Sequence, residues 1–156
     1  MNQRALISRQ FYQAMGYGLN LREPRTFSEK IQWTKLFWQD SLLTHCADKV
    51  TCKDYVRQKL GRDICLPTLA TYGAAAEFDP SALPDGFALK LNCGSGHTLI
   101  CHDQAACHPR AIQRQLAGWL RPEANHYYHS YEWAYRDITP RIIAEPVIGD
   151  TGGLGE

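Results

Sequence analysis

The sequence lacks any long uninterrupted hydrophobic run and any large excess of charge of one sign. No stretch approaches the roughly 20 apolar residues of a membrane-spanning helix, and Arg4, Arg9 and Gln10 interrupt the segment where a signal peptide has its apolar core. Seventeen basic and sixteen acidic residues leave a formal net charge of +1, too little to attract nucleic acid or an anionic membrane. We therefore expect a cytoplasmic protein with no integral membrane segment and no nucleic acid partner, in which any anion site is local.

Several short motifs are also missing. No G-K-[ST] sequence occurs, which excludes a Walker phosphate loop, and no D-x-D sequence is present to hold a metal-bound sugar nucleotide. The histidines and cysteines lack the usual spacing of a zinc finger, which disfavours structural zinc. Without a secretory signal or a C-x-x-C pair, free thiols are expected rather than a disulfide framework. The cysteines concerned are Cys46, Cys52, Cys65, Cys93, Cys101 and Cys107.

The first 60 or so residues have a helical pattern. A hydrophobic content of 44% in 156 residues is sufficient for a globular domain with a core. Apolar residues at three- and four-residue intervals predict a first helix that ends at Gly16. Thr26 and Glu29 have capping-box spacing and predict the start of a second helix. A third helix is predicted over residues 47–60, with Gly61 as its stop.

Beyond Gly61 the pattern changes to strands and turns. The segments FALKLNC (87–93) and HTLIC (97–101) flank a short glycine-rich turn, which predicts an antiparallel hairpin. A helix is predicted over residues 109–120, and the apolar segment RIIAEPVI (141–148) predicts a final strand. Helices followed by strands and a further helix indicate the α+β fold class.

The hairpin contains a candidate anion site. Lys90 lies in its first strand, four residues before Gly94, and the turn continues with Ser95 and Gly96. Glycine lets a backbone approach a phosphate closely, amides freed in such a turn can donate to it, and a strand lysine supplies a fixed positive charge. An ordinary hairpin with an exposed lysine gives the same pattern, and the motif alone does not choose between these interpretations.

Three other features are ambiguous when each is taken alone. Asp48 can cap a helix from whose first turn Lys49 projects, but a capped helix with a solvated lysine explains the pair equally well. Glu145 ends an apolar strand before Pro146, either as an exposed terminus or as a hydrogen-bond acceptor in a cleft. The aromatic segment 126–135 could stack on sugars or bases, although its helical spacing favours core packing.

Taken in order, several segments resemble the TupA-like ATP-grasp family. They are TFSEKIQWTKLF, HCADKV, LPTLATYG, LPDGFALKLNCGSGHTLIC and EWAYRDITPRIIAEPVI, and the resemblance extends from about residue 16 to residue 148. It implies a helical segment (1–61) that precedes the small lid subdomain of an ATP-grasp fold with its following helices (62–140). Residues 141–156 would then be a hinge strand and the start of a second subdomain, which the sequence does not complete.

The resemblance implies roles for the residues singled out above. In the wider ATP-grasp superfamily a lysine of a D-K pair and a strand lysine bind the phosphates of ATP, and these correspond here to Lys49 and Lys90. The turn formed by Gly94, Ser95 and Gly96 would cover the phosphates as a lid. Together these residues would form the phosphate end of a nucleotide site.

The adenosine end of that site is implied further along the chain. Glu145 would accept a hydrogen bond from the adenine amine, and the backbone of Val147 would meet the adenine edge. His97 occupies the lid position, but the resemblance assigns it no role. Asp150 is a weak candidate for the ribose hydroxyls, because the sequence around it departs into a glycine-rich tail.

The function implied by the resemblance is that of an ATP-dependent carboxylate ligase. Members of the family are associated with bacterial cell-surface polysaccharide and teichuronopeptide synthesis, so a polysaccharide or peptide precursor would be the acceptor. ATP-grasp chemistry uses ATP and Mg²⁺ to phosphorylate a carboxylate, and an amine or similar nucleophile then displaces phosphate. The sequence ends before any cluster of acidic Mg²⁺ ligands. We therefore expect a truncated chain that is inactive by itself, and we assign no catalytic residue.

Two other functions remain open. Many similar sequences are labelled glycosyltransferases, which would require a sugar-nucleotide site. A non-catalytic interaction module would instead use the aromatic segment to pack against a partner. Lys90 with its glycine turn favours nucleotide binding, because an interaction module has no need of this combination.

Overall fold

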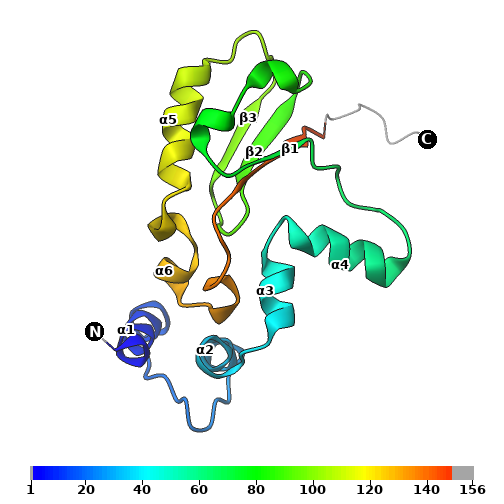
Figure 1. Cartoon of the computed structure of the whole chain (residues 1–156). Coiled ribbons are helices and arrows are strands. Elements are labelled where there is room, and N and C mark those ends of the chain that lie inside the picture. Colours follow the sequence, from blue (N-terminus) through cyan, green and yellow to red (C-terminus); the bar gives the residue numbers. More distant parts are fainter. Residues whose placement is uncertain (1, 149–156) are drawn as a thin grey trace, which may run out of the picture.

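The computed structural model describes residues 2–148 and confirms the α+β class. Within this range the chain forms six α-helices, several short 3₁₀ turns and one four-stranded antiparallel sheet. Four helices come first in the chain. The sheet lies at the opposite end of the molecule from α1 and α2 (Figure 1). No helix in this part of the chain combines the length and the apolar character needed to cross a membrane.

The first helix ends, and the second begins, where the sequence predicts. Helix α1 (Gln3–Met15) is capped by the side chain of Asn2 and ends at Gly16, whose φ of 77° is a left-handed conformation that suits glycine. Helix α2 (Phe27–Phe37) begins with the predicted capping box, in which Thr26 and Glu29 each satisfy a backbone N–H of the other. Glu29 is the one buried residue of this helix.

The third predicted helix begins later than predicted, and a helix that the sequence did not predict precedes it. Helix α3 (Ser41–Ala47) ends at Asp48, which has an extended backbone, and helix α4 (Thr51–Leu60) begins three residues later. The carboxylate of Asp48 accepts a hydrogen bond from the N–H of Val50 at 2.8 Å. Aspartate stabilises a break of this kind by replacing a lost helical acceptor. The prediction of one helix over residues 47–60 was therefore wrong at its beginning and right at its end, Gly61.

The sheet has the strand order β1-β4-β2-β3, with every neighbouring pair antiparallel. Strands β2 (Phe87–Leu91) and β3 (Thr98–Cys101) form the predicted hairpin, which pairs Lys90 with Thr98. Strand β4 (Ile142–Pro146) is the predicted last strand and lies between β2 and the short β1 (Ala70–Tyr72). The segment around Glu145 is thus placed at the centre of the sheet, beside the strand that carries Lys90.

The main core lies on one face of this sheet. Helix α5 (Pro109–Trp119), which was predicted from its periodicity, buries Ile112 and Leu116 against it (Figure 1). The short helix α6 (Tyr127–Ser130) and a 3₁₀ turn (Trp133–Tyr135) carry the aromatic segment. Tyr135 packs against the core, whereas Tyr128 is exposed. The residues that form the core are Tyr72, Phe78, Leu83, Phe87, Leu89, Leu91, Cys93, Cys101, Ile112, Leu116, Ile138, Ile142 and Ala144.

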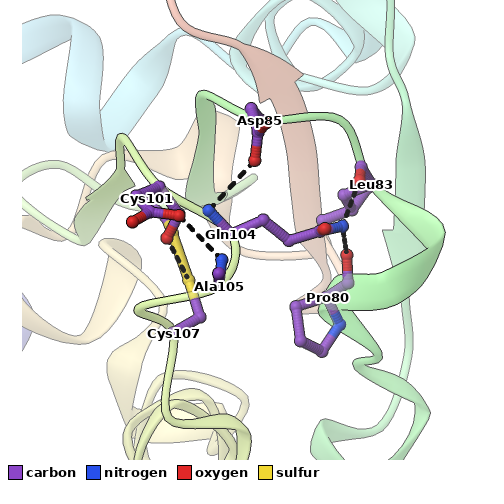
Figure 2. Close-up of a disulfide and its surroundings, with 8 residues drawn as sticks. Pro80, Leu83, Asp85, Cys101, Gln104, Ala105 and Cys107 are labelled. Carbon is purple, nitrogen blue, oxygen red and sulfur yellow. Dashed lines mark hydrogen bonds between the residues drawn. A yellow bond between two sulfur atoms is a disulfide. The ribbon is translucent and has the colours of Figure 1, made fainter.

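One expectation about the cysteines was wrong. Cys101, at the end of β3, and Cys107, just before α5, form a disulfide, because the loop between them returns the chain towards the strand (Figure 2). The same loop is held by Gln104, whose side-chain amide donates to the carbonyls of Pro80 and Leu83. The remaining four cysteines are free.

Candidate functional site

The alternation of strand β2 separates its core residues from Lys90. Phe87, Leu89 and Leu91 are fully buried on one face, whereas Lys90 is on the other face and is partly accessible. Strand β4 pairs with β2 so that Glu145 lies opposite Ala88, one alternation away from Lys90 on the same face. The Nζ of Lys90 and the Oε2 of Glu145 are 2.8 Å apart. The structure therefore brings together two residues that the sequence singled out separately.

A second lysine, Lys53 of α4, completes this cluster. Its Nζ lies 2.5 Å from the Oε1 of Glu145 and donates to the carbonyl of Leu66 and the hydroxyl of Thr68, each at 2.8 Å. The sequence analysis did not single out Lys53. A usable signal was its position four residues after Lys49 in a predicted helix, a spacing that places side chains on neighbouring parts of one face.

The two lysines have different contacts with Glu145 and with solvent. The side chains of Lys53 and Glu145 are 13% and 7% exposed, whereas that of Lys90 is 32% exposed. Burial alone would raise the pKa of Glu145, but its hydrogen bonds to Lys53 and Lys90 outweigh burial and hold the pKa below its ordinary value. The cluster has two positive charges for one negative charge, and the more accessible excess charge is on Lys90.

Lys49 lies at the glycine turn and does not contact Glu145. Its Nζ donates to the carbonyl of Gly94 at 2.6 Å and to that of Asn92 at 3.3 Å. Burial lowers the pKa of Lys49, and the nearby positive charge of Lys90 adds to this effect. Lys49 thus reaches the turn from the α3–α4 junction, whereas Lys90 of β2 pairs with Glu145 and is near enough to affect the pKa of Lys49.

The turn itself has the features that a backbone anion site requires. No acceptor in residues 2–148 takes the N–H of Ser95 or Gly96, and both residues are exposed. Gly96 has a φ of 83°, in the left-handed region that favours glycine. A Cβ on Gly94 would lie 2.9 Å from the Cδ2 of Leu91, so this position is too crowded for a side chain. Both glycines are therefore required by the backbone conformation or by packing.

Three further residues were considered for the site from the sequence: Val147, His97 and Asp150. The N–H of Val147 donates to the carbonyl of Gly86 at 2.9 Å, which leaves only its own carbonyl for a ligand. His97 packs edge-on against Trp119, with ring centroids 5.6 Å apart, and its Nδ1 is buried without a partner in the described residues. Asp150 lies outside the described residues.

Asn92 is buried and forms hydrogen bonds to three other segments of the chain. The sequence analysis did not single it out. Its side-chain amide donates to the Oδ1 of Asp48 at 3.0 Å and to the carbonyl of Thr139 at 3.1 Å. Its Oδ1 accepts from the backbone N–H of Arg141 at 2.8 Å, and its own backbone carbonyl is one of the acceptors of Lys49. Asn92 thus connects the helix junction, the end of β2 and the start of β4.

Cys93 follows Asn92 in the chain and is also buried. Burial raises the pKa of the Cys93 thiol to about 11, so this cysteine is protonated at neutral pH.

Comparison with known families identifies the family of this chain. The model of the TupA-like ATP-grasp family matches residues 29–154, which is most of the chain. The chain belongs to the TupA-like ATP-grasp family. No curated protein and no solved structure matches it. Membership of this family makes the protein ATP-grasp-type and confirms the family predicted from the sequence.

ATP-grasp enzymes use ATP and Mg²⁺, and the described residues of this ATP-grasp protein fit these two groups to different degrees. The lysines and the open turn amides suit a polyphosphate, because Lys49 contacts the turn and Lys90 lies on the strand that leads into it. Mg²⁺ prefers several oxygen ligands, including carboxylates. Residues 2–148 contain no group of three or more His, Cys, Asp or Glu side chains that could hold a metal ion. The described residues therefore offer no ready-made metal cage, and no chemical step is assigned to Mg²⁺.

The charge cluster predicts a pH dependence of folding. The pKa of Glu145 is lowered from 4.5 in the folded protein, so the unfolded chain binds the proton more readily. The stabilisation is complete above the unfolded pKa and is lost as the pH falls through the folded pKa. We expect Glu145→Gln to lose less stability than wild type when the pH is lowered below about 4.5, as measured by urea unfolding. Glu23→Gln, which alters an exposed ion pair, is the control, and parallel curves for wild type and Glu145→Gln would contradict this role for the cluster.

Proposed function

We propose that this ATP-grasp protein binds ATP with its phosphates at the 94–96 turn. The observation that carries the proposal is the contact of Lys49 with a turn whose Ser95 and Gly96 amides have no acceptor in the described chain, in a hairpin whose first strand also holds Lys90. Charge and aligned amides together favour a phosphate over a neutral ligand. Of Lys53 and Lys90, the two lysines that pair with Glu145, Lys90 is the more accessible, so it is the one proposed to contact a phosphate.

Glu145 is proposed to hold Lys53 and Lys90 in place and to accept the adenine amine. Each of its carboxylate oxygens accepts one lysine in the structure. A carboxylate has about four acceptor positions, so an additional hydrogen bond from adenine is compatible with both ion pairs. The carbonyl of Val147, at the end of the same segment, is the backbone group proposed to meet the adenine edge.

The reaction we propose is ATP-dependent activation of a carboxylate during synthesis of a cell-surface polysaccharide or peptide precursor. Phosphoryl transfer to a carboxylate gives an acyl phosphate, and an amine or similar nucleophile then displaces phosphate. The contribution proposed for Lys49, Lys90 and the turn is to position the phosphates and to neutralise their charge. Mg²⁺ would accompany ATP in such a reaction, and use of ATP as co-substrate supports a cytoplasmic location.

The nucleotide proposal is tested by calorimetric titration of the full chain with ATP, ADP, AMP and UDP-glucose. We expect affinity to increase with the number of phosphates, so that ATP and ADP bind more tightly than AMP. Lys90→Ala should reduce the binding free energy of ATP by roughly 1.5 to 3 kcal/mol, the range for a hydrogen bond to a charged group. Lys30→Ala is the matched control, because Lys30 is an exposed lysine of α2, and that helix lies far from the sheet (Figure 1).

Each other outcome identifies a different function. Preference for UDP-glucose over ATP would favour a glycosyltransferase, because nothing proposed for Glu145 recognises uracil or a sugar. Equal loss of ATP affinity in Lys90→Ala and Lys30→Ala would show that binding is non-specific. Absence of nucleotide binding would leave an interaction module as the better description.

A further inference from the structure

The exposed hydrophobic side chains of the molecule are concentrated in the N-terminal part of the chain. Of the fifteen large hydrophobic side chains that are exposed in the described chain, nine lie within residues 12–42. The most exposed of them, Phe27 at the start of α2, is 78% exposed. Hydrophobic residues that are exposed singly are common on soluble proteins, but a concentration of them marks an interaction surface. The nucleotide site proposed above uses none of these nine residues.

Helix α2 has its apolar side on the outside. Successive residues of a helix are about 100° apart, which places four hydrophobic residues within one half of its circumference: Phe27, Ile31, Trp33 and Phe37. All four are exposed. The opposite side is buried or half-buried, although it includes Glu29 and is mostly polar. A helix of a globular protein normally has the reverse arrangement, with its apolar side towards the core. We call the exposed side the outer face of α2.

The same part of the chain has an excess of positive charge. The net charge of the whole chain is only +1, but residues 1–42 contain six basic and three acidic residues. Of the acids, Glu29 is buried in the capping box and Glu23 pairs with Arg25. The third, Asp40, caps α3 through its Oδ1. This segment therefore has more basic side chains than its carboxylates neutralise.

Two of these cations lie at the outer face of α2. Lys30 is three residues from both Phe27 and Trp33, a spacing that places it between them on the helix surface. Its ammonium forms no ion pair or hydrogen bond with the described residues. From α1, the guanidinium of Arg4 lies 5.0 Å from the ring centroid of Phe37. Aromatic rings and cations thus share this surface.

This composition fits an anionic lipid surface. Helices that lie in a membrane interface combine Phe, Trp and aliphatic residues with Lys and Arg, whose charges contact the headgroups. Aromatic side chains enter the boundary between headgroups and acyl chains, while the long stem of a lysine lets its ammonium stay among the headgroups. A second copy of this chain fits less well, because a symmetric dimer would bring two positively charged faces together.

We propose that the outer face of α2 binds an anionic lipid surface, with its hydrophobic side chains at the acyl boundary and Lys30 against the headgroups. The helix lies along the surface in this arrangement, because its eleven residues are too few to span a bilayer. Figure 1 shows α2 at the opposite end of the molecule from the sheet, so attachment leaves the phosphate turn accessible. Lipid binding goes beyond the proposed function and does not depend on the nucleotide.

The test is co-sedimentation of the full chain with vesicles of phosphatidylcholine alone and of phosphatidylcholine with one third phosphatidylglycerol. We expect binding to the anionic vesicles, much weaker binding to the neutral ones, and loss of binding in high salt. Phe27→Ser should lower the partition coefficient roughly ten-fold, the change expected when a large side chain no longer enters the apolar phase. Lys30→Gln should lower it roughly five-fold on anionic vesicles only.

Matched variants elsewhere in the chain are the controls. Ile64→Ser removes an exposed hydrophobic side chain, and Lys59→Gln removes an exposed lysine of α4, both outside the N-terminal segment. Neither should change the binding. Circular dichroism shows whether each variant is folded, and Phe27 and Lys30 are exposed, so their substitution should leave the fold intact.

Tryptophan fluorescence with brominated phosphatidylcholine in the anionic vesicles measures contact with the acyl boundary directly. Bromine quenches a tryptophan only at short range. Trp33 belongs to the outer face, and Trp38, which directly follows α2, is also exposed. We expect quenching in wild type and its loss in the double variant Trp33→Phe with Trp38→Phe, which retains Trp119 and Trp133.

Several outcomes would overturn lipid binding by this face. They are absence of binding to the anionic vesicles, equal binding to both vesicles, equal partition of wild type and Phe27→Ser, or quenching that persists in the double tryptophan variant. A dimer in sedimentation velocity that Phe27→Ser dissociates would show instead that a second copy covers the face. The ATP affinity of Phe27→Ser should equal that of wild type, so the vesicle assay and the nucleotide titration succeed or fail independently.

Discussion

Glu145→Ala is expected to lower the free energy of unfolding by roughly 3 to 5 kcal/mol, the cost of breaking a buried ion pair by removing one partner. The substitution leaves Lys53 and Lys90 facing each other without the carboxylate that separates and neutralises them. The cost of the unpaired charge is largest for Lys53, because its side chain is only 13% exposed. Urea unfolding of wild type and Glu145→Ala, followed by circular dichroism, measures the difference.

A matched set of variants shows whether charge or packing is responsible. Replacing both buried partners, as in Glu145→Leu with Lys53→Met, removes the charges together, and we expect this double variant to be more stable than Glu145→Ala. Glu23→Ala removes an exposed carboxylate that pairs with Arg25 and should cost about 1 kcal/mol or less. If Glu145→Ala were as mild as Glu23→Ala, the cluster would contribute no more than a surface ion pair.

Local signals in the sequence were sufficient for much of the fold. The capping box at Thr26 and Glu29, the left-handed stop at Gly61 and the alternation of residues 87–91 each depend on neighbours within a few positions. The start of α4 was predicted too early because it depends on Asp48, whose carboxylate also binds Asn92, 44 residues later in the chain. The Cys101–Cys107 disulfide was missed because spacing does not show how a loop returns to its strand.

The candidate site likewise has residues that the sequence indicated and contacts that it did not. Lys49, Lys90, the glycine turn and Glu145 were singled out because their order along the chain resembles one family, and membership of that family is now established. Their contacts were not predictable. The Lys90–Glu145 pair depends on the register between β2 and β4, and Lys53 and Asn92 take part through contacts that cross the fold. A family resemblance orders residues along the chain, but the geometry arises from strand pairing and from buried polar contacts.

Asn92 gives the second large expected effect. Its side chain is fully buried, and Asn92→Ala would remove three hydrogen bonds, to Asp48, Thr139 and Arg141. With a net contribution of about 1 kcal/mol per bond, and a further cost for backbone groups left unsatisfied, we expect a loss of roughly 3 kcal/mol in the free energy of unfolding. Thermal and urea unfolding of wild type and Asn92→Ala measure this loss.

Asn92→Asp separates the hydrogen-bond role from simple packing. This variant keeps the shape of the side chain but places a second carboxylate against the Oδ1 of Asp48, which accepts the amide of Asn92 at 3.0 Å. Repulsion between the two carboxylates should make Asn92→Asp less stable than Asn92→Ala near neutral pH. A carboxyl group introduced there has a raised folded pKa, so lowering the pH protonates it and restores a donor towards Asp48. We therefore expect the stability difference between the two variants to shrink or reverse in acid. If Asn92→Asp and Asn92→Ala keep the same difference from neutral to acidic pH, the connection between the helix junction and the sheet does not depend on this hydrogen bond.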